Sequence, residues 1–181
     1  MIKIDFSQVR FLIVDDNAHM RRILRTLLYG FGARDVYEAG DGASALAAFA
    51  QLVPDIIITD WEMPIIDGLE FTQIIRQPEA NANPYVPIIM VTANLERKHV
   101  ISARDASVTE FLAKPISANS LHERIASIIL LPRQFIKSAT YFGPDRRRSV
   151  RGYGGEERRK AGEANVIRRS EPFEKVVRLA I

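Results

Sequence analysis

The chain has 181 residues, enough for one domain of about 100–150 residues and an extension. It contains no cysteine, which excludes disulfides and thiolate metal sites. Residues 1–131 carry 12 Lys and Arg against 16 Asp and Glu, a formal charge of −4, whereas residues 132–181 carry 13 against 6, a charge of +7. We therefore expect an acidic domain over residues 1–131 and a basic tail over residues 132–181.

The sequence shows no pattern for secretion or membrane insertion. Charged Lys3, Asp5 and Arg10 interrupt the N-terminal segment, so it does not read as a signal peptide. The apolar run at residues 125–131 is far shorter than the roughly 20 residues that a membrane-spanning helix needs. The expected location is the cytoplasm, without a membrane partner.

The first 131 residues alternate between short apolar segments and segments with helical periodicity. The expected strands are Phe11–Val14, Val36–Ala39, Ile56–Thr59, Ile88–Val91 and Phe111–Ala113. The expected helices are His19–Tyr29, Gly42–Leu52, Gly68–Arg76, Glu96–Ala106 and Ser117–Leu131. This alternation predicts an α/β fold, a doubly wound five-stranded parallel sheet with five helices on its two faces and right-handed crossovers.

Charged side chains follow three of these strands directly. Asp15 and Asp16 follow the first strand, Asp60 follows the third, and Lys114 follows the fifth. Because the carboxyl ends of parallel strands meet at one edge of the sheet, these residues are expected to gather there. Three carboxylates and one ammonium in one pocket predict a metal site and a carboxylate that accepts a phosphoryl group.

Several motifs occur in order and with consistent spacing along residues 9–130. They are Phe11-Leu12-Ile13-Val14-Asp15-Asp16-Asn17, Met20-Arg21-Arg22-Ile23, Glu38-Ala39-Gly40-Asp41-Gly42, Asp60-Trp61-Glu62-Met63-Pro64 through Asp67-Gly68, Val91-Thr92-Ala93, and Lys114-Pro115. Together they resemble a bacterial response-regulator receiver domain, and most closely the chemotaxis type. The resemblance implies a flavodoxin-like fold with strand order 2-1-3-4-5.

The resemblance also implies a chemistry centred on Asp60. This residue would be the phosphoacceptor, receiving its phosphoryl group from a histidine kinase or a histidine phosphotransfer protein. Mg²⁺ would be bound by Asp16, Asp60 and the backbone carbonyl of Glu62, with Asp15 holding a coordinated water. Such a protein is not an enzyme in the usual sense, because it takes part only in its own phosphotransfer and dephosphorylation.

Residues of the last two strands complete the expected site. By the same resemblance, Lys114 would pair with a phosphoryl oxygen and the Thr92 hydroxyl would bind another. Phe111 takes the place of the aromatic residue that moves inward when the phosphate recruits the threonine, without the hydroxyl of the commoner tyrosine. A cis peptide is expected before Pro115. Glu62 departs from the Asn that chemotaxis-type receivers often carry, and this leaves the dephosphorylation rate open.

The basic tail gives weaker signals. It contains two loose copies of a Gly-x-acid-basic-basic element, one at residues 143–148 and one at residues 154–160. Similar tails follow some receivers of α-proteobacterial type. Gly-Pro and Gly-Gly steps predict a mostly irregular tail, with a short amphipathic helix within Ser170–Ile181. The opposite charges of domain and tail predict that the tail folds back on its own domain or on a second copy of the chain. Binding to a second copy would give self-association through the tail.

Three function classes are compatible with these patterns. The first is a phosphoacceptor that acts through contacts with a downstream protein target and has no DNA-binding output domain. The second is a nucleic-acid-binding regulator that uses the arginine clusters with Tyr141, Phe142 and Tyr153, although interspersed acidic residues make nucleic acid an unlikely partner. The third is an aspartyl-phosphate hydrolase, which the sequence Asp15-Asp16-Asn17 fits poorly because that class has Asp-x-Asp after its first strand.

Overall fold

The structure is a computed structural model that describes residues 2–81, 83–93, 96–138, 141–145, 165–167, 173 and 176–179. The predictions for the basic elements at residues 146–148 and 154–160 and for Tyr153 lie outside these residues. Most of the segment for which a C-terminal helix is predicted also lies outside them.

A five-stranded parallel sheet forms the centre of the molecule. Its strands are β2 (Arg10–Val14), β3 (Asp35–Ala39), β4 (Ile56–Asp60), β5 (Ile88–Thr92) and β6 (Glu110–Ala113), in the spatial order β3-β2-β4-β5-β6. Counted along the domain, this is the order 2-1-3-4-5, so the predicted fold is confirmed. Every residue of β4 and β5 is buried, because both strands lie inside the sheet and helices cover both of its faces.

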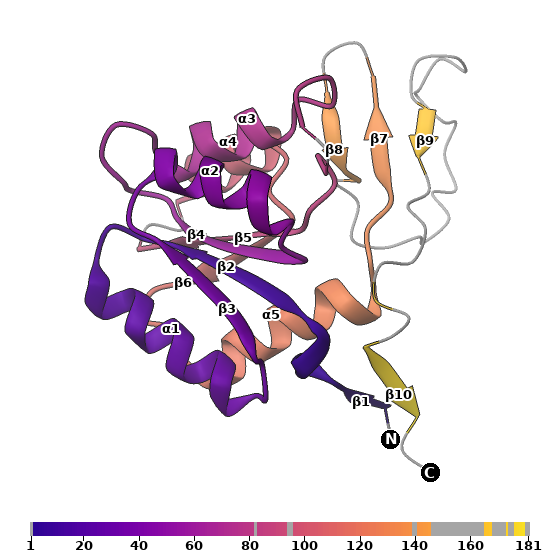
Figure 1. Cartoon of the computed structure of the whole chain (residues 1–181). Coiled ribbons are helices and arrows are strands. Elements are labelled where there is room, and N and C mark those ends of the chain that lie inside the picture. Colours follow the sequence, from indigo (N-terminus) through magenta and orange to yellow (C-terminus); the bar gives the residue numbers. More distant parts are fainter. Residues whose placement is uncertain are drawn as a thin grey trace.

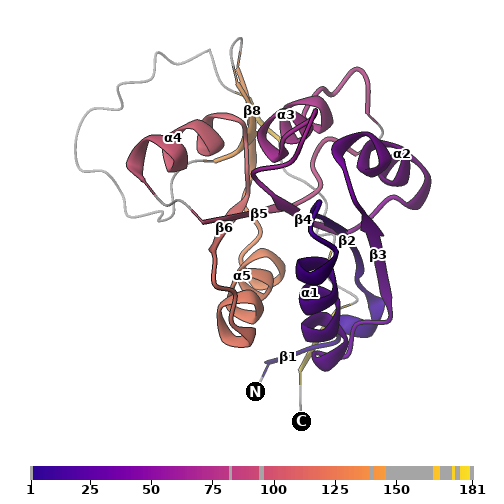
Figure 2. The same cartoon turned by 90° about the vertical axis from the view of Figure 1, so that its left-hand side faces the viewer.

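Five helices cover the sheet in two layers (Figure 1). They are α1 (Ala18–Gly30), α2 (Gly42–Leu52), α3 (Gly68–Ile75), α4 (Arg97–Asp105) and α5 (Ala118–Leu130). Helices α1 and α5 lie on one face, and α2, α3 and α4 lie on the other (Figures 1 and 2). The side chains of each strand alternate between these layers: Phe11 and Ile13 pack with α1 and α5, whereas Leu12 and Val14 pack with α2 and α3.

Four helices begin at side-chain caps near the carboxyl edge of the sheet. Asn17, Asp41, Asp67 and Ser117 are N-cap residues whose side-chain oxygens accept backbone N–H groups of the first turn. These bonds pair donors that the helix itself leaves unpaired. The caps therefore fix the loops that follow β2, β3, β4 and β6 at one edge of the sheet.

The chain also forms elements that the sequence patterns do not indicate. Near the N-terminus these are strand β1 (Ile2–Ile4) and the 3₁₀ helix η1 (Phe6–Gln8). In the tail, β7 (Phe135–Lys137), β8 (Phe142–Pro144) and β9 (Asn165–Ile167) form an antiparallel sheet in the order β8-β7-β9. Strand β10 (Val177–Leu179) pairs antiparallel with β1.

Strand β10 corrects one prediction. A helix is expected within Ser170–Ile181, but Val177–Leu179 are extended and pair with Ile2–Ile4. The physical reason is that β1 offers an open row of backbone donors and acceptors, which an extended partner satisfies and a helix does not.

Both described parts of the tail contact the α/β domain. Phe173 and Val176 are buried in the same apolar cluster as α1 and α5, and the Asp5 N–H donates to the Val176 carbonyl at 2.8 Å. At the other end of the domain, Arg133 pairs with the buried Glu110 at 3.0 Å. Folding back of the tail is thus seen in these residues, and apolar packing and strand pairing contribute to it as well as charge. Among the described helices, none is long and apolar enough to cross a membrane.

Candidate functional site

Asp60 and Lys114 are in direct contact at the carboxyl edge of the sheet. The Lys114 Nζ lies 2.9 Å from Asp60 Oδ2 and 3.8 Å from Asp15 Oδ2. Both carboxylates are almost fully buried, at 1% exposure for Asp15 and 6% for Asp60, while Lys114 remains partly open to solvent. Strands β2, β4 and β6 therefore bring together the three side chains that the strand-end argument predicts.

Asp16 completes a cluster of three carboxylates. Oxygen atoms from Asp15, Asp16 and Asp60 lie within 4.8 Å of one another, and Asp16 is exposed. Within the described residues, Asp15 Oδ2 is buried and has no hydrogen-bond donor. Carboxylate oxygens that face a partly open pocket are the ligands that Mg²⁺ prefers. The acidic pocket therefore fits a divalent cation.

The environment of Asp15 raises the pKa of its carboxyl. Burial raises the pKa of the Asp15 carboxyl above its ordinary value, and the neighbouring charges of Asp60 and Asp16 raise it further. The Asn17 backbone N–H and the Lys114 ammonium act in the opposite direction. The pocket thus holds more negative charge than its single lysine compensates, which is the electrostatic condition for cation binding.

Backbone groups orient both buried carboxylates. The Asn17 N–H donates to Asp15 Oδ1 at 2.8 Å, and the Trp61 N–H donates to Asp60 Oδ1 at 2.9 Å. The Oδ2 atoms of Asp15 and Asp60 are therefore the ones that face Lys114. Each aspartate accepts a hydrogen bond from a backbone N–H one or two residues further along the chain, so the orientation of both side chains depends on local backbone geometry.

Arg21 of helix α1 holds the main chain just past the end of β2. Its Nη1 donates to the Asp15 carbonyl at 2.6 Å, and its Nε pairs with Glu38 at 3.2 Å. Arg25, one turn later, pairs with the same Glu38 at 2.7 Å. Arg21 belongs to one of the sequence motifs, Met20-Arg21-Arg22-Ile23. The motif alone does not indicate which acceptor the arginine side chain reaches.

Gly68 allows helix α3 to begin against the end of β4. Its N–H donates to the Trp61 carbonyl at 2.9 Å. A Cβ at this position would overlap the Asp60 carbonyl oxygen and would lie 3.0 Å from the Asp60 carbonyl carbon. Only glycine fits this close backbone approach, so Gly68 helps to fix the main chain of Asp60.

The remaining predicted residues lie around this centre. Thr92 is buried at the end of β5, and its carbonyl accepts the Lys114 N–H at 2.9 Å. The Lys114–Pro115 peptide is cis, as the resemblance implies. Phe111 is partly buried and packs with Met90, Ala103 and Val108.

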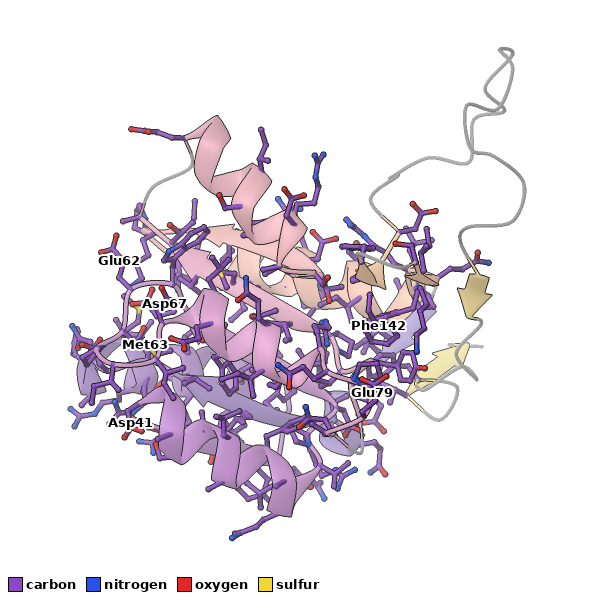
Figure 3. All side chains as sticks on the ribbon, turned by 90° about the horizontal axis from the view of Figure 1, so that it is seen from above. Asp41, Glu62, Met63, Asp67, Glu79 and Phe142 are labelled. Carbon is purple, nitrogen blue, oxygen red and sulfur yellow. The ribbon has the colours of Figure 1, made fainter. Side chains whose placement is uncertain are left out.

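Glu62 lies in the loop after Asp60, and its side chain is exposed. Figure 3 shows it at the same end of the molecule as Met63 and Asp67, which come from that loop and from the cap of α3. The exposed Glu62 side chain can therefore face a ligand that enters the acidic pocket.

Comparisons with known proteins agree with this geometry. Residues 11–126 match the family model described as "Response regulator receiver domain". Chemotaxis protein CheY-3 of Vibrio cholerae serotype O1 is 36% identical over 122 residues, which cover 67% of this chain and 92% of that protein. Chemotaxis protein CheY of Pseudomonas aeruginosa is 37% identical over 120 residues, covering 66% and 95%.

Solved structures show the same likeness. The structure of chemotaxis protein CheY4 of Vibrio cholerae superposes with a TM-score of 0.62 at 28% identity, covering 66% of this chain and 98% of that one. The receiver domain of response regulator 1452 of Francisella superposes with a TM-score of 0.59 at 27% identity, covering 65% and 93%.

Proposed function

Because the chain belongs to the response-regulator receiver family, we propose that it is a two-component phosphoacceptor in which Asp60 receives a phosphoryl group from a phosphohistidine. The donor is a histidine kinase or a histidine phosphotransfer protein. The observation that carries the proposal is the pairing of a buried carboxylate, Asp60, with Lys114 at 2.9 Å beside two further carboxylates.

In this proposal Asp60 Oδ2 is the nucleophile. A new O–P bond forms as the N–P bond to the donor histidine breaks, and the imidazole nitrogen keeps the electron pair and takes up a proton. The Trp61 N–H holds Oδ1, so that Oδ2 is directed toward the pocket where Lys114 lies. The Lys114 ammonium moves from the carboxylate to a phosphoryl oxygen and neutralises charge there.

A cation is required because the pocket is repulsive to an anion. Two like unit charges 4 Å apart repel by about 4 kcal/mol at an effective dielectric of 20. In the proposal Asp16, Asp60 and the Glu62 carbonyl would hold Mg²⁺, Asp15 would bind one of its waters, and the ion would supply charge neutralisation at the transferring phosphoryl group. The buried Asp15 oxygen without a hydrogen-bond donor supports this assignment.

Thr92 and Phe111 are proposed to report the phosphorylated state. The Thr92 hydroxyl would bind a phosphoryl oxygen, and Phe111 would move toward the space that the threonine leaves. Phe111 already packs with Ala103 of α4, so its movement would reach that helix. The protein would then act by changing its contacts with a downstream protein target.

We propose a protein-contact output because two of the tail aromatics, Tyr141 and Phe142, have internal partners. The Phe142 ring lies 5.3 Å from the Tyr85 ring, and the Tyr141 hydroxyl donates to the Pro144 carbonyl at 2.8 Å. Neither side chain is then free to stack on a nucleic-acid base. The basic elements of the nucleic-acid alternative lie outside the described residues.

The test is covalent labelling of the full chain with a small acyl phosphate and Mg²⁺. Intact mass should show one added phosphoryl group, and peptide mapping should place it on Asp60. The Asp60→Asn variant should remain unlabelled, while Asp35→Asn, an exposed acid of β3, should label like the parent. Equal labelling of Asp60→Asn would overturn the assignment.

A further inference from the structure

Strands β7 and β8, with the described residues 135–138 and 141–144, form a tail hairpin that docks on the end of helix α4. The Ser107 hydroxyl, just beyond α4, donates to the Phe142 carbonyl at 2.7 Å. A Cβ on Gly143 would overlap the Ser107 side chain and would lie 2.7 Å from the Tyr141 hydroxyl. The hairpin backbone therefore sits directly on Ser107, at a distance that only glycine permits.

Arg76 lies beneath the same contact. It is 5% exposed, its Nε donates to the Ser107 carbonyl at 3.1 Å, and its guanidinium lies 5.3 Å from the centre of the Phe135 ring. Tyr85 packs edge-on against two aromatic residues of the hairpin, with ring centres 5.1 Å from Phe135 and 5.3 Å from Phe142. Aromatic and cation–π contacts prefer specific geometries, so these contacts hold the hairpin in one position on this surface.

The docking surface lies at the end of the molecule opposite to the phosphoacceptor. Figure 3 shows Phe142 beside Glu79 at one end and Glu62 at the other. Helix α4 starts after the loop that follows Thr92 and ends just before Ser107, so it runs from the phosphoacceptor edge to the hairpin. Its nine residues span roughly 13 Å.

The inner face of α4 connects the two ends. Ala103 and Val108 are buried with Met90, and Trp61 and Phe111 pack against this cluster. Trp61 is the neighbour of Asp60, and Phe111 lies on the strand that ends at Lys114. A rearrangement at the phosphoacceptor therefore reaches the packing of α4 through side chains already in contact.

Ser107 has a strained backbone at the point where α4 and the hairpin meet. Its φ is +71°, in the left-handed region that a non-glycine residue seldom adopts. The Ser107 hydroxyl, bonded to the hairpin, and the Ser107 carbonyl, bonded to Arg76, hold this conformation. If α4 shifts, Ser107 loses the geometry on which hairpin docking depends.

We propose that the tail hairpin is a clamp that holds α4 in its unphosphorylated position, so that phosphorylation of Asp60 releases the hairpin. The clamp rests on the proposed function of Asp60. The hairpin docks while Lys114 is bonded to Asp60 itself, and a phosphoryl group on Asp60 must break that bond. Coupling is reciprocal: the factor by which phosphorylation weakens docking is the factor by which docking weakens binding of a phosphoryl mimic.

The experiment uses the full chain, the beryllium fluoride anion as phosphoryl mimic, and Mg²⁺. Trp61, the sole tryptophan and the neighbour of Asp60, reports mimic binding by fluorescence. Amide hydrogen exchange reports hairpin docking. In the parent chain the mimic should speed exchange in residues 134–138 and 141–145 by at least about fivefold, the lower end of usual coupling.

Gly143→Ala weakens docking at the hairpin, at the end of the molecule opposite to Asp60. It should speed hairpin exchange without the mimic and tighten mimic binding, by at most the factor by which the mimic weakens docking in the parent chain. Gly30→Ala is the matched control, because a Cβ there meets no atom within 4 Å, and it should behave like the parent. If Gly143→Ala unfolds the chain, Ser107→Ala removes only the hydroxyl that bonds Phe142 and should act in the same direction more weakly.

The outcomes separate the clamp from the proposed function. If the parent binds the mimic but hairpin exchange and the affinity of the weakened variant stay unchanged, the hairpin is a static extension and the clamp is wrong. If the parent and Asp60→Asn both fail to bind the mimic, the proposed function is wrong and the clamp falls with it.

Discussion

Arg21 donates a hydrogen bond from its Nη1 to the Asp15 carbonyl at 2.6 Å, so a helix side chain holds the backbone of a strand end. The same guanidinium pairs with Glu38 of the neighbouring strand β3. Arg21 thereby ties the end of β2 to helix α1 and to β3. The acidic pocket is therefore supported by a basic residue that is not among the residues proposed to bind the phosphoryl group.

We expect Arg21→Met to slow phosphorylation of Asp60 by roughly three- to tenfold while the fold is retained. Loss of a charge-assisted hydrogen bond to the Asp15 carbonyl costs about 1.5–3 kcal/mol and lets the loop after β2 relax. Labelling rates with a small acyl phosphate measure the effect. Arg22→Met, the exposed neighbour on the same helix, is the control and should label at the parent rate.

We expect Asp15→Asn to stabilise the metal-free protein at neutral pH by about 1–3 kcal/mol, the usual cost of a buried unsatisfied acceptor. Because the folded-state pKa of Asp15 lies above its unfolded value, the folded carboxyl takes up its proton first as the pH falls. The parent therefore regains stability as the pH falls. The stability advantage of the variant shrinks as the pH passes the folded-state pKa of Asp15 and approaches 3.8, the ordinary pKa of the carboxyl. Urea unfolding across this range measures the difference, and a gap that grows toward acid would contradict the sign.

We expect Mg²⁺ to raise the thermal midpoint of the parent chain, because a ligand that binds only the folded state adds RT ln(1 + [L]/Kd) of stability, about 2.7 kcal/mol at a hundredfold excess over Kd. Asp16→Asn should lose most of this effect, since it removes the exposed carboxylate of the cluster. Asp105→Asn changes an exposed acid at the end of α4 and serves as the control. An equal response of both variants would exclude Asp16 as a ligand.

We expect Gly68→Ala to destabilise the fold by about 1–3 kcal/mol, the usual cost of overpacking, and to slow labelling of Asp60. The added methyl overlaps the Asp60 carbonyl, so the start of α3 must move away from the end of β4. Denaturant unfolding gives the stability and intact mass gives the rate. Gly30→Ala, in open space, should leave the labelling rate unchanged.

The α/β domain was predictable because its signals are local and repeated. Each strand of β2 to β6 was expected to within a residue of its bounds, since a buried parallel strand is a short apolar run between helical patterns. Asp15, Asp60 and Lys114 were predicted to meet because their positions follow from strand ends alone. The contact of Arg21 with the Asp15 carbonyl was not predicted, because the position of a residue on a helix does not show which carbonyl its long side chain reaches.

The tail was not predictable by the same means. Strands β7 to β10 have three residues each, too few for a period of two to stand out. Their pairing depends on partners distant in sequence, as between Ile2–Ile4 and Val177–Leu179. Val176 and Val177 fit the apolar face of an amphipathic helix. The backbone hydrogen-bonding groups at the edge of β1 favour an extended partner instead.

The pairing of β1 with β10 also bears on the order in which the molecule folds. Ile2 pairs with Leu179 and Ile4 with Val177, so these contacts join residues that are very far apart in the sequence. Contacts of this kind form slowly, because a large loop must close before any pairing is gained. During synthesis β1 leaves the ribosome long before its partner exists, and the α/β domain folds first. Strand β1 is then an open edge until β10 is translated and pairs with it.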